Sequence, residues 1–146
     1  MGLFLEGDIG DKAKLLETIR RFEISAVIHF AAFAYIGESM SRPELYFENN
    51  VKKSLTLLDA IVESGVRHVV FSSSCATYGT PIRMPITEEM PKVPVNPYGE
   101  TKLIIERALR WYGAAHNISW TALRYFNAAG ADWVATLAKC TLWKPI

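Results

Sequence analysis

The sequence predicts an α/β fold in which helices alternate with the strands of a parallel sheet. Three apolar runs, at 26–30, 66–71 and 119–125, have the length and composition of strands buried in such a sheet. Segments of helical periodicity separate these runs, and crossovers of this length join strands that run parallel, normally with a right-handed turn. The chain has 146 residues, 50% hydrophobic and 21% charged, which is the composition of a single globular domain.

The N-terminal part opens with a short apolar segment, Leu3–Leu5, which is predicted to be a strand that ends in a turn at 6–8. Asp11 is expected to cap the next helix, because an aspartate oxygen can accept a hydrogen bond from a free backbone N–H group there. Apolar residues then recur at helical spacing, at positions 15, 16, 19 and 22. The strand 26–30 and a loop of small residues, 31–37, follow.

A second helix is expected from Pro43 to about Ser64, with Gly65 as its C-cap. Residues 75–97 contain five prolines, which predict an irregular excursion after the strand 66–71. A third helix from about Tyr98 to Ala115 leads into the strand 119–125.

Composition excludes several classes of function. The net charge is +1, and acidic and basic residues are interleaved, so no nucleic-acid partner is expected. No apolar run is long enough to span a bilayer, so no membrane partner is expected. Two cysteines and three isolated histidines form no metal-ligand pattern. A reducing, cytoplasmic setting is the default for such a chain.

Tyr98 and Lys102 are the pair that carries the most chemistry. They lie one helical turn apart, so both side chains fall on the same face of a helix. An ammonium group held beside a phenol favours the phenolate form, which can transfer protons near neutral pH. Upstream, the strand 66–71 runs into three serines, 72–74, which place hydroxyl groups at a strand end.

Ser74, Tyr98 and Lys102 together resemble the triad of the short-chain dehydrogenase/reductase superfamily. Four further runs resemble its extended branch, the NAD-dependent epimerases and dehydratases of nucleotide sugars, and within that branch the UDP-glucose 4-epimerase family. These runs are Glu6–Ile9, His29–Ala32, Asn49–Val51 and Arg124–Asn127, and the resemblance covers about residues 5–132. Ser74 is followed by Cys75-Ala76-Thr77-Tyr78-Gly79, without the carboxylates that a dehydratase needs, which favours an epimerase.

The resemblance implies that NAD is the cofactor and a UDP-hexose the substrate. Tyr98 as phenolate would take the proton of the sugar 4-hydroxyl while the 4-hydride passes to NAD, which leaves a 4-keto sugar. Ser74 would hydrogen-bond the same oxygen, Lys102 would hold the cofactor ribose, and Asn127 would contact the substrate beside Ser74 and Tyr98. The positions expected to contact NAD are Asp8, Ile9, Phe30, Ala31, Ala32, Phe33, Ala34, Asn50, Ser72, Lys102, Tyr125 and Phe126.

Some of these residues have a second interpretation. Asn50 could be a polar residue inside a helix that is bonded to a loop, and Ser72 could only satisfy backbone groups at the strand end. His29 is expected to be a core histidine rather than a catalyst. Cys75 is most simply a small buried residue.

A glycine fingerprint for the cofactor pyrophosphate is absent, since Gly2, Gly7 and Gly10 lack the required spacing. We therefore expect a partial Rossmann-like, doubly wound parallel sheet that lacks its N-terminal βαβ unit. Residues 1–132 would form this partial NAD-binding domain, and the strand 26–30 would be left with an unpaired apolar edge.

Residues 133–146 are interpreted as an atypical tail. Codons that can encode Trp133–Ile146 can also be read in a shifted frame that begins at the third base. In that frame they permit Gly-Gly-Asp-Ile-Gly-Glu-Val-His-Thr-Leu-Glu-Thr-His, which resembles an epimerase continuation. The hypothesis is that the tail is out of frame.

Three alternatives stay open for the function. By the resemblance, the chain would be a UDP-glucose 4-epimerase by descent with little or no activity by itself, and its intact form would be a homodimer. It could instead belong to an epimerase of another nucleotide sugar, such as UDP-arabinose or UDP-glucuronate. It could also be a non-catalytic remnant that acts by association with a complete subunit.

Overall fold

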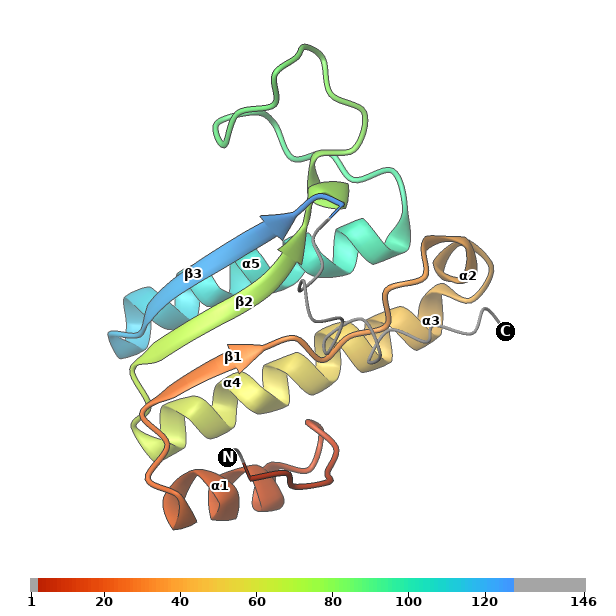
Figure 1. Ribbon diagram of the computed structural model, residues 1–146. Helices are drawn as coiled ribbons and strands as arrows, with labels where there is room; N and C mark the ends of the chain where they lie inside the picture. Colours follow the sequence, from red (N-terminus) through yellow and green to blue (C-terminus); the bar gives the residue numbers. More distant parts are fainter. Residues whose placement is uncertain (1–2, 128–146) are drawn as a thin grey trace, which may run out of the picture.

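The computed structural model describes residues 3–127 and has the predicted α/β architecture, with a three-stranded parallel sheet in the order β1-β2-β3 (Figure 1). The elements are α1 (Lys12–Arg21), β1 (Ala26–His29), α2 (Ile36–Ser41), α3 (Pro43–Tyr46), η1 (Phe47–Lys52), α4 (Lys53–Ser64), β2 (His68–Ser74), η2 (Cys75–Tyr78), α5 (Pro97–His116) and β3 (Ser119–Tyr125). Each parallel pair is joined by a connection that contains a long helix, as the sequence pattern predicted. The predicted tail at 133–146 lies outside the described residues.

The sheet register is continuous across all three strands. Ala26 pairs with His68, His68 pairs with Ser119, and the ladder between β2 and β3 runs on to Ser74 and Tyr125. Within residues 3–127, β1 pairs only with β2, and Ile28 on it is 61% exposed. The expected open edge is therefore present in the described part of the chain.

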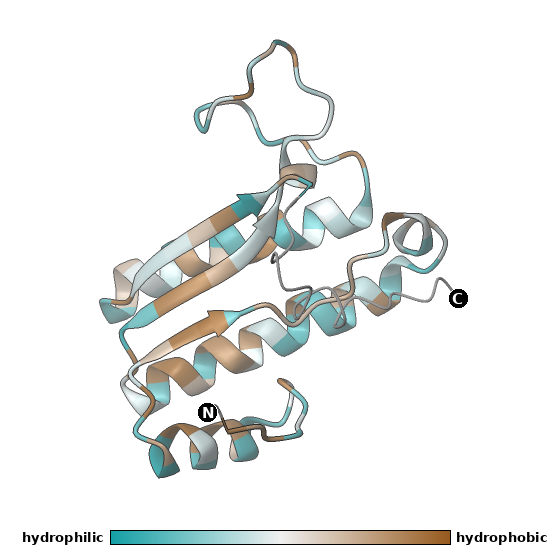
Figure 2. Cartoon of the chain, in the orientation of Figure 1, coloured by the Kyte–Doolittle hydropathy of each residue, from teal (hydrophilic) through white to brown (hydrophobic). Residues whose placement is uncertain are grey.

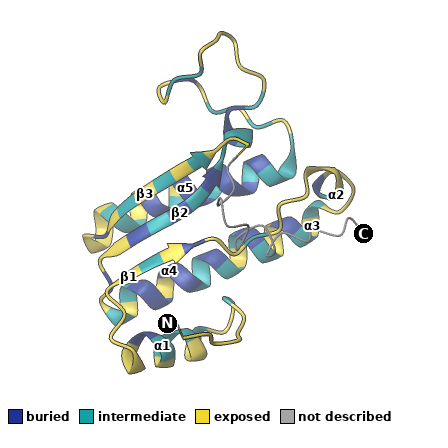
Figure 3. Cartoon of the chain, in the orientation of Figure 1, coloured by how far each residue is buried: buried dark blue, intermediate teal, exposed yellow. Residues whose placement is uncertain are grey.

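One hydrophobic core lies between the sheet and the helices α4 and α5. Most of its buried members come from both helices and from β2, on which Figure 3 shows dark blue, buried positions, and α1 adds Ile19. Figure 2 shows the same distribution as brown, hydrophobic stretches on β1, β2 and α4. The largest fully buried side chains include Leu58, Ile61, Phe71, Ile105 and Leu109.

The two predicted caps, Asp11 and Gly65, are confirmed, and the structure adds a third at Asn96. The Asp11 side chain accepts a hydrogen bond from the Lys14 N–H group at 3.0 Å, at the start of α1. Gly65 ends α4 with a φ of 80°, a left-handed conformation that glycine adopts without strain. Asn96 caps α5 by accepting from the Gly99 N–H group at 2.7 Å, and Pro97 fills the first helical position.

Two expectations about the elements are wrong. Leu3–Leu5 is exposed and lies outside every strand, because a strand needs a partner and the described sheet ends at β1. The loop expected at 31–37 ends early, since α2 begins at Ile36. The helix expected from Pro43 is present, but residues 47–52 within it form a π-helix, which apolar periodicity does not reveal.

The first turn of α5 packs closely against η2. A Cβ atom added to Gly99 would stand 2.5 Å from the Ala76 carbonyl oxygen, so no other residue fits there without a shift of the backbone. This contact places the start of α5 directly beside the carboxyl end of β2.

A buried ion pair joins α5 to β3. Glu106 accepts two hydrogen bonds from the Arg124 guanidinium, at 2.9 Å from Nε and 2.7 Å from Nη2. The side chain of Glu106 is 6% exposed and that of Arg124 is 20% exposed. Such a bidentate pair fixes orientation as well as distance.

Among residues 3–127 no helix is long and apolar enough to cross a membrane, and no group of three or more histidine, cysteine, aspartate or glutamate side chains could hold a metal ion.

Gly99→Ala is expected to lower the free energy of unfolding by about 1–3 kcal/mol, because the new methyl group collides with a backbone carbonyl that cannot move freely. Gly37→Ala is the matched control. Its Cβ meets its nearest neighbour at 3.5 Å, an ordinary contact, and alanine favours the helix α2. Thermal unfolding followed by circular dichroism compares the two variants. Equal stability of Gly99→Ala and the unmodified chain would contradict the close packing.

Glu106→Gln is expected to destabilise the fold by about 3 kcal/mol, since it leaves the Arg124 guanidinium largely buried without a carboxylate. The control is Glu48→Gln, which breaks an exposed i,i+4 pair with Lys52 worth about 0.3–0.5 kcal/mol. Urea unfolding measures both changes. Similar losses in the two variants would show that burial does not strengthen the Glu106 pair.

Candidate active site

The carboxyl end of β2 presents its serines to two different sides. Ser73 is buried and faces α5, whereas Ser72 and Ser74 are half-buried and alternate with it along the strand. The ladder sets Ser72 beside Leu123 and Ser74 beside Tyr125. Ligands of open α/β sheets bind beyond this edge, where the parallel strands end.

Lys102 reaches this strand end from α5. Its Nζ donates to the Ser72 carbonyl oxygen at 2.7 Å and lies 5.8 Å from the centroid of the Tyr98 ring. The predicted shared helix face of Tyr98 and Lys102 is therefore present. Lys102 is only 4% exposed, and burial lowers its pKa from 10.5 to about 8, so the side chain is still mostly an ammonium at neutral pH.

Tyr98 is half-buried, and its backbone is held on both sides. Its N–H group donates to the Ser39 hydroxyl oxygen of α2 at 3.3 Å. Its carbonyl oxygen accepts from the Thr101 hydroxyl at 2.7 Å. These contacts fix the second residue of α5, from which the phenol projects.

Ser74 has a defined hydrogen-bond direction. Its hydroxyl oxygen accepts from the Ala76 N–H group at 3.2 Å, and its carbonyl oxygen accepts from the Thr77 hydroxyl at 2.9 Å. Because Oγ accepts from the backbone here, its own proton is left to donate elsewhere. The Gly99–Ala76 contact brings this hydroxyl-bearing turn against the start of α5.

Asn50, in the π-helix η1, holds the loop after β1. Its Oδ1 accepts from the Phe33 N–H group at 2.8 Å, and its Nδ2 donates to the Phe33 carbonyl at 2.9 Å and to Thr101 at 3.3 Å. Asn50 is 3% exposed. The alternative of a helix residue bonded to a loop thus describes the observed contacts, and the loop 31–34 is the segment that it orients.

The ends of β1 and β3 meet across β2. The Phe30 and Tyr125 rings stack with centroids 6.5 Å apart, which joins two of the positions expected to contact NAD. Phe126 and Asn127 follow and are exposed, as are Ala31, Phe33 and Ala34, while Ala32 is half-buried. These residues form the rim of the strand ends.

Asp8 and Ile9 lie apart from this group, on the segment before α1. The Asp8 carboxylate accepts from Lys53 Nζ at 2.6 Å and from the Gly10 N–H group at 2.7 Å, and these two bonds lower its pKa. Both residues line a cavity of about 200 Å³ together with Leu15 and Thr18. His29 is buried and bonds to Ser54 at 2.8 Å, and burial lowers its pKa to about 4, as a neutral core histidine requires.

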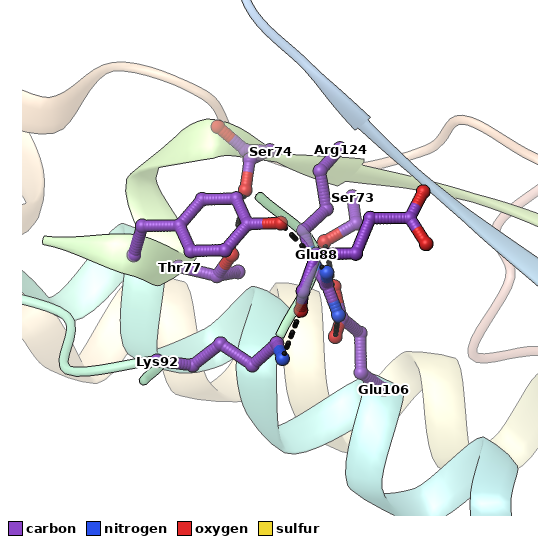
Figure 4. Close-up of polar contacts among 8 residues, drawn as sticks. Ser73, Ser74, Thr77, Glu88, Lys92, Glu106 and Arg124 are labelled. Carbon is purple, nitrogen blue, oxygen red and sulfur yellow. Dashed lines mark hydrogen bonds and ion pairs between the residues drawn. The ribbon is translucent and has the colours of Figure 1, made fainter. Parts of the chain in front are cut away.

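A polar network beside Ser74 was not assigned by sequence reasoning. Figure 4 shows Ser73 and Arg124 turned toward Glu106. Ser73 donates to Glu106 at 2.6 Å, and Arg124 Nη1 donates to the Tyr78 hydroxyl at 2.9 Å. Two signals point to it: Glu106 is four residues after Lys102, and Arg124 is a charge inside a strand of mainly apolar residues.

A cavity of about 440 Å³ lies along β3. Arg124, Tyr78 and Phe126 line it together with Glu88 and Trp120.

The sequence matches curated proteins closely. The UDP-glucose 4-epimerase of Lactobacillus helveticus is 48% identical over 129 residues, which are 88% of this chain and 39% of that enzyme. The enzyme of the same name from Halalkalibacterium halodurans is 51% identical over 130 residues. The chain therefore spans about two-fifths of the length of these relatives.

Solved structures give the same result. UDP-glucose 4-epimerase from Brucella ovis in complex with NAD superposes with a TM-score of 0.87 at 53% identity and covers 90% of this chain and 40% of its own. The Bifidobacterium longum enzyme in complex with NAD+ and UDP has a TM-score of 0.84 at 40% identity and covers 88% of this chain and 39% of its own. The model of the NAD dependent epimerase/dehydratase family matches residues 3–139, and the chain belongs to this family.

Proposed function

We propose that this chain carries the reacting side chains of a UDP-glucose 4-epimerase, with Tyr98, Ser74 and Lys102 as its catalytic residues. The observation that supports the proposal is that α5 brings Tyr98 and the buried Lys102 ammonium to the carboxyl end of β2, the strand whose last residue is Ser74. Tyr98 takes the proton of the sugar 4-hydroxyl as a general base, and Lys102, whose Nζ lies 5.8 Å from the centroid of the Tyr98 ring, stands beside it on the same helix face. Ser74 donates its hydroxyl proton to the same sugar oxygen.

NAD fits the residues that surround this site. A lysine ammonium has three N–H donors, and the bond to Ser72 uses one of them, so the others can donate to ribose hydroxyls. The flat Phe30 and Tyr125 pair and the backbone of the loop 31–34 would line the cofactor, with Asn50 holding that loop. Asp8 and Ile9 would contact the adenosine half, and Tyr125 and Phe126 the side toward the sugar. When bound, NAD supplies the acceptor and donor of a hydride.

UDP-glucose is favoured over other nucleotide sugars by the names of the similar proteins. Structures named UDP-glucose 4-epimerase are 30% to 53% identical to this chain, and a UDP-N-acetylglucosamine 4-epimerase from Methanobrevibacter ruminantium, at 33%, lies in the lower part of this range. One UDP-glucose-4-epimerase, from Stenotrophomonas maltophila, holds formylated UDP-arabinopyranose beside NAD and is 37% identical. Measuring the turnover of UDP-glucose, UDP-arabinose and UDP-glucuronate by the full protein would compare these substrates. Within residues 3–127, Asn127 is the proposed contact to the sugar.

The proposal includes a homodimer formed through α4 and α5 of the whole protein, in a cytoplasmic setting. Trp111 on α5 is 69% exposed, and a helical partner would cover this large apolar side chain. Light scattering of the full protein gives the oligomeric state.

Tyr98→Phe is expected to lower kcat at least about 100-fold, because it removes the proton-transfer group while it keeps the ring. The measurement uses a chimera in which residues 3–127 replace the matching segment of the Brucella ovis enzyme, with conversion of UDP-galactose to UDP-glucose as the assay. Ser74→Ala is expected to lower kcat as well. Tyr112→Phe is the control, since the Tyr112 hydroxyl donates to Asp59 at 2.6 Å, away from the strand ends. Full activity of Tyr98→Phe would overturn the assignment.

Lys102→Met is expected to change how stability depends on pH. The pKa of Lys102 falls from 10.5 in the unfolded chain to about 8 in the fold, so the charged form costs up to about 3 kcal/mol below pH 8. The cost is relieved as pH rises from about 8 to about 10.5. The unmodified chain should therefore gain stability relative to Lys102→Met over that range, in urea unfolding of the 146-residue chain. Lys14→Met, at an exposed site of α1, should show no such gain.

A further inference from the structure

Three successive residues at the carboxyl end of β2 are held by contacts from two elements, α5 and η2. The Ser72 carbonyl accepts from Lys102 of α5 at 2.7 Å. The Ser73 hydroxyl donates to Glu106 at 2.6 Å, one helical turn further along α5. The Ser74 hydroxyl oxygen accepts from Ala76 of η2 at 3.2 Å. The contact of Ser73 with Glu106 connects the strand to side chains that have no role in the proposed reaction.

These groups form a closed path around Ser74. Arg124 is the β3 partner of Ser73 in the sheet, and its Nε and Nη2 both donate to Glu106. Its third nitrogen, Nη1, donates to the hydroxyl of Tyr78 at 2.9 Å, and the guanidinium also lies 5.2 Å from the centroid of that ring. Tyr78 is the last residue of η2, the turn that contains Ala76. Hydrogen bonds therefore link α5 through β3 to η2, the turn that Ser74 caps.

We propose that Glu106, Arg124 and Tyr78 are positioning residues for the Ser74 hydroxyl, a role that rests on the function proposed above. They hold η2 where the Ala76 N–H group donates to Ser74 Oγ. That bond selects one rotamer of a side chain that has three, and it turns the hydroxyl proton toward the substrate oxygen. Glu106 shares a helix with Tyr98 and Lys102, so the same path sets Ser74 relative to both.

The burial of this network favours a geometric role over a purely stabilising one. A buried ion pair adds little stability compared with apolar residues of the same volume, because both charges lose their water. The path contains five hydrogen bonds. Four of them join Ser73, Glu106, Arg124 and Tyr78, and the fifth runs from the Ala76 N–H group to Ser74. These bonds fix direction, since the guanidinium is a rigid planar fork.

Amide hydrogen exchange of the 146-residue chain tests the structural half of this proposal. Tyr78→Phe removes only the hydroxyl that Arg124 holds. We expect exchange of the Ala76 amide to accelerate about tenfold or more, while the amide of the core residue Ile105 keeps its rate. Tyr112→Phe loses a comparable phenol contact, to Asp59, and should leave Ala76 unchanged. An unchanged Ala76 amide in Tyr78→Phe, or an equal acceleration at Ile105, would overturn the proposal.

Kinetic coupling in the chimera tests the functional half. Tyr78→Phe should lower kcat about tenfold when Ser74 is present, with little change in KM. In a Ser74→Ala background the same substitution should change kcat by less than about twofold, because the group it positions is gone. Equal effects in both backgrounds would show a general structural role and refute the proposal. If Ser74→Ala alone leaves kcat unchanged, the proposed function fails and the positioning role fails with it, whatever the exchange result.

Discussion

One face of α5 determines the geometry of the strand ends. Gly99 meets the carbonyl of Ala76, Lys102 bonds to Ser72, and Glu106 bonds to Ser73. These three helix residues are spaced by three and four positions, which is the spacing of neighbours on one helical stripe. Every group proposed to react or to position a reacting group depends on this stripe lying flat against β2. A shift of the helix by one residue would separate all of them at once.

The site carries interactions that a purely stabilising core would avoid. Burial is unfavourable for the charged form of Lys102 and lowers its pKa, and Asn50 is a buried amide in a π-helix. Both are retained with their hydrogen bonds made, and among residues 3–127 no buried side-chain nitrogen or oxygen lacks a partner. Each buried polar atom thus has at least one partner without a ligand, which helps these side chains to keep their orientation.

The sequence predicted those parts of the fold that depend on local pattern. The three strands of the sheet, the caps at Asp11 and Gly65, and the shared face of Tyr98 and Lys102 follow from spacing and residue type. The bond from Arg124 to Tyr78 and that from Ser73 to Glu106 join residues 46 and 33 positions apart, which no local pattern encodes. The segment Leu3–Leu5 has the composition of a strand, yet strand formation requires a neighbour and composition cannot supply one.

The two parts of the proposed cofactor site are held with unequal strength. The strand ends are joined by buried contacts among β2, β3 and α5, including a bidentate ion pair and a glycine packed on a carbonyl. The segment of Asp8 and Ile9 is attached to α4 through an exposed ion pair with Lys53, which salt and water weaken. The reacting end is therefore built to be rigid on its own, whereas the position of the Asp8 segment depends on what else contacts it. Because precise placement matters most where protons move, this distribution of rigidity suits the proton transfer proposed for Tyr98 and Ser74.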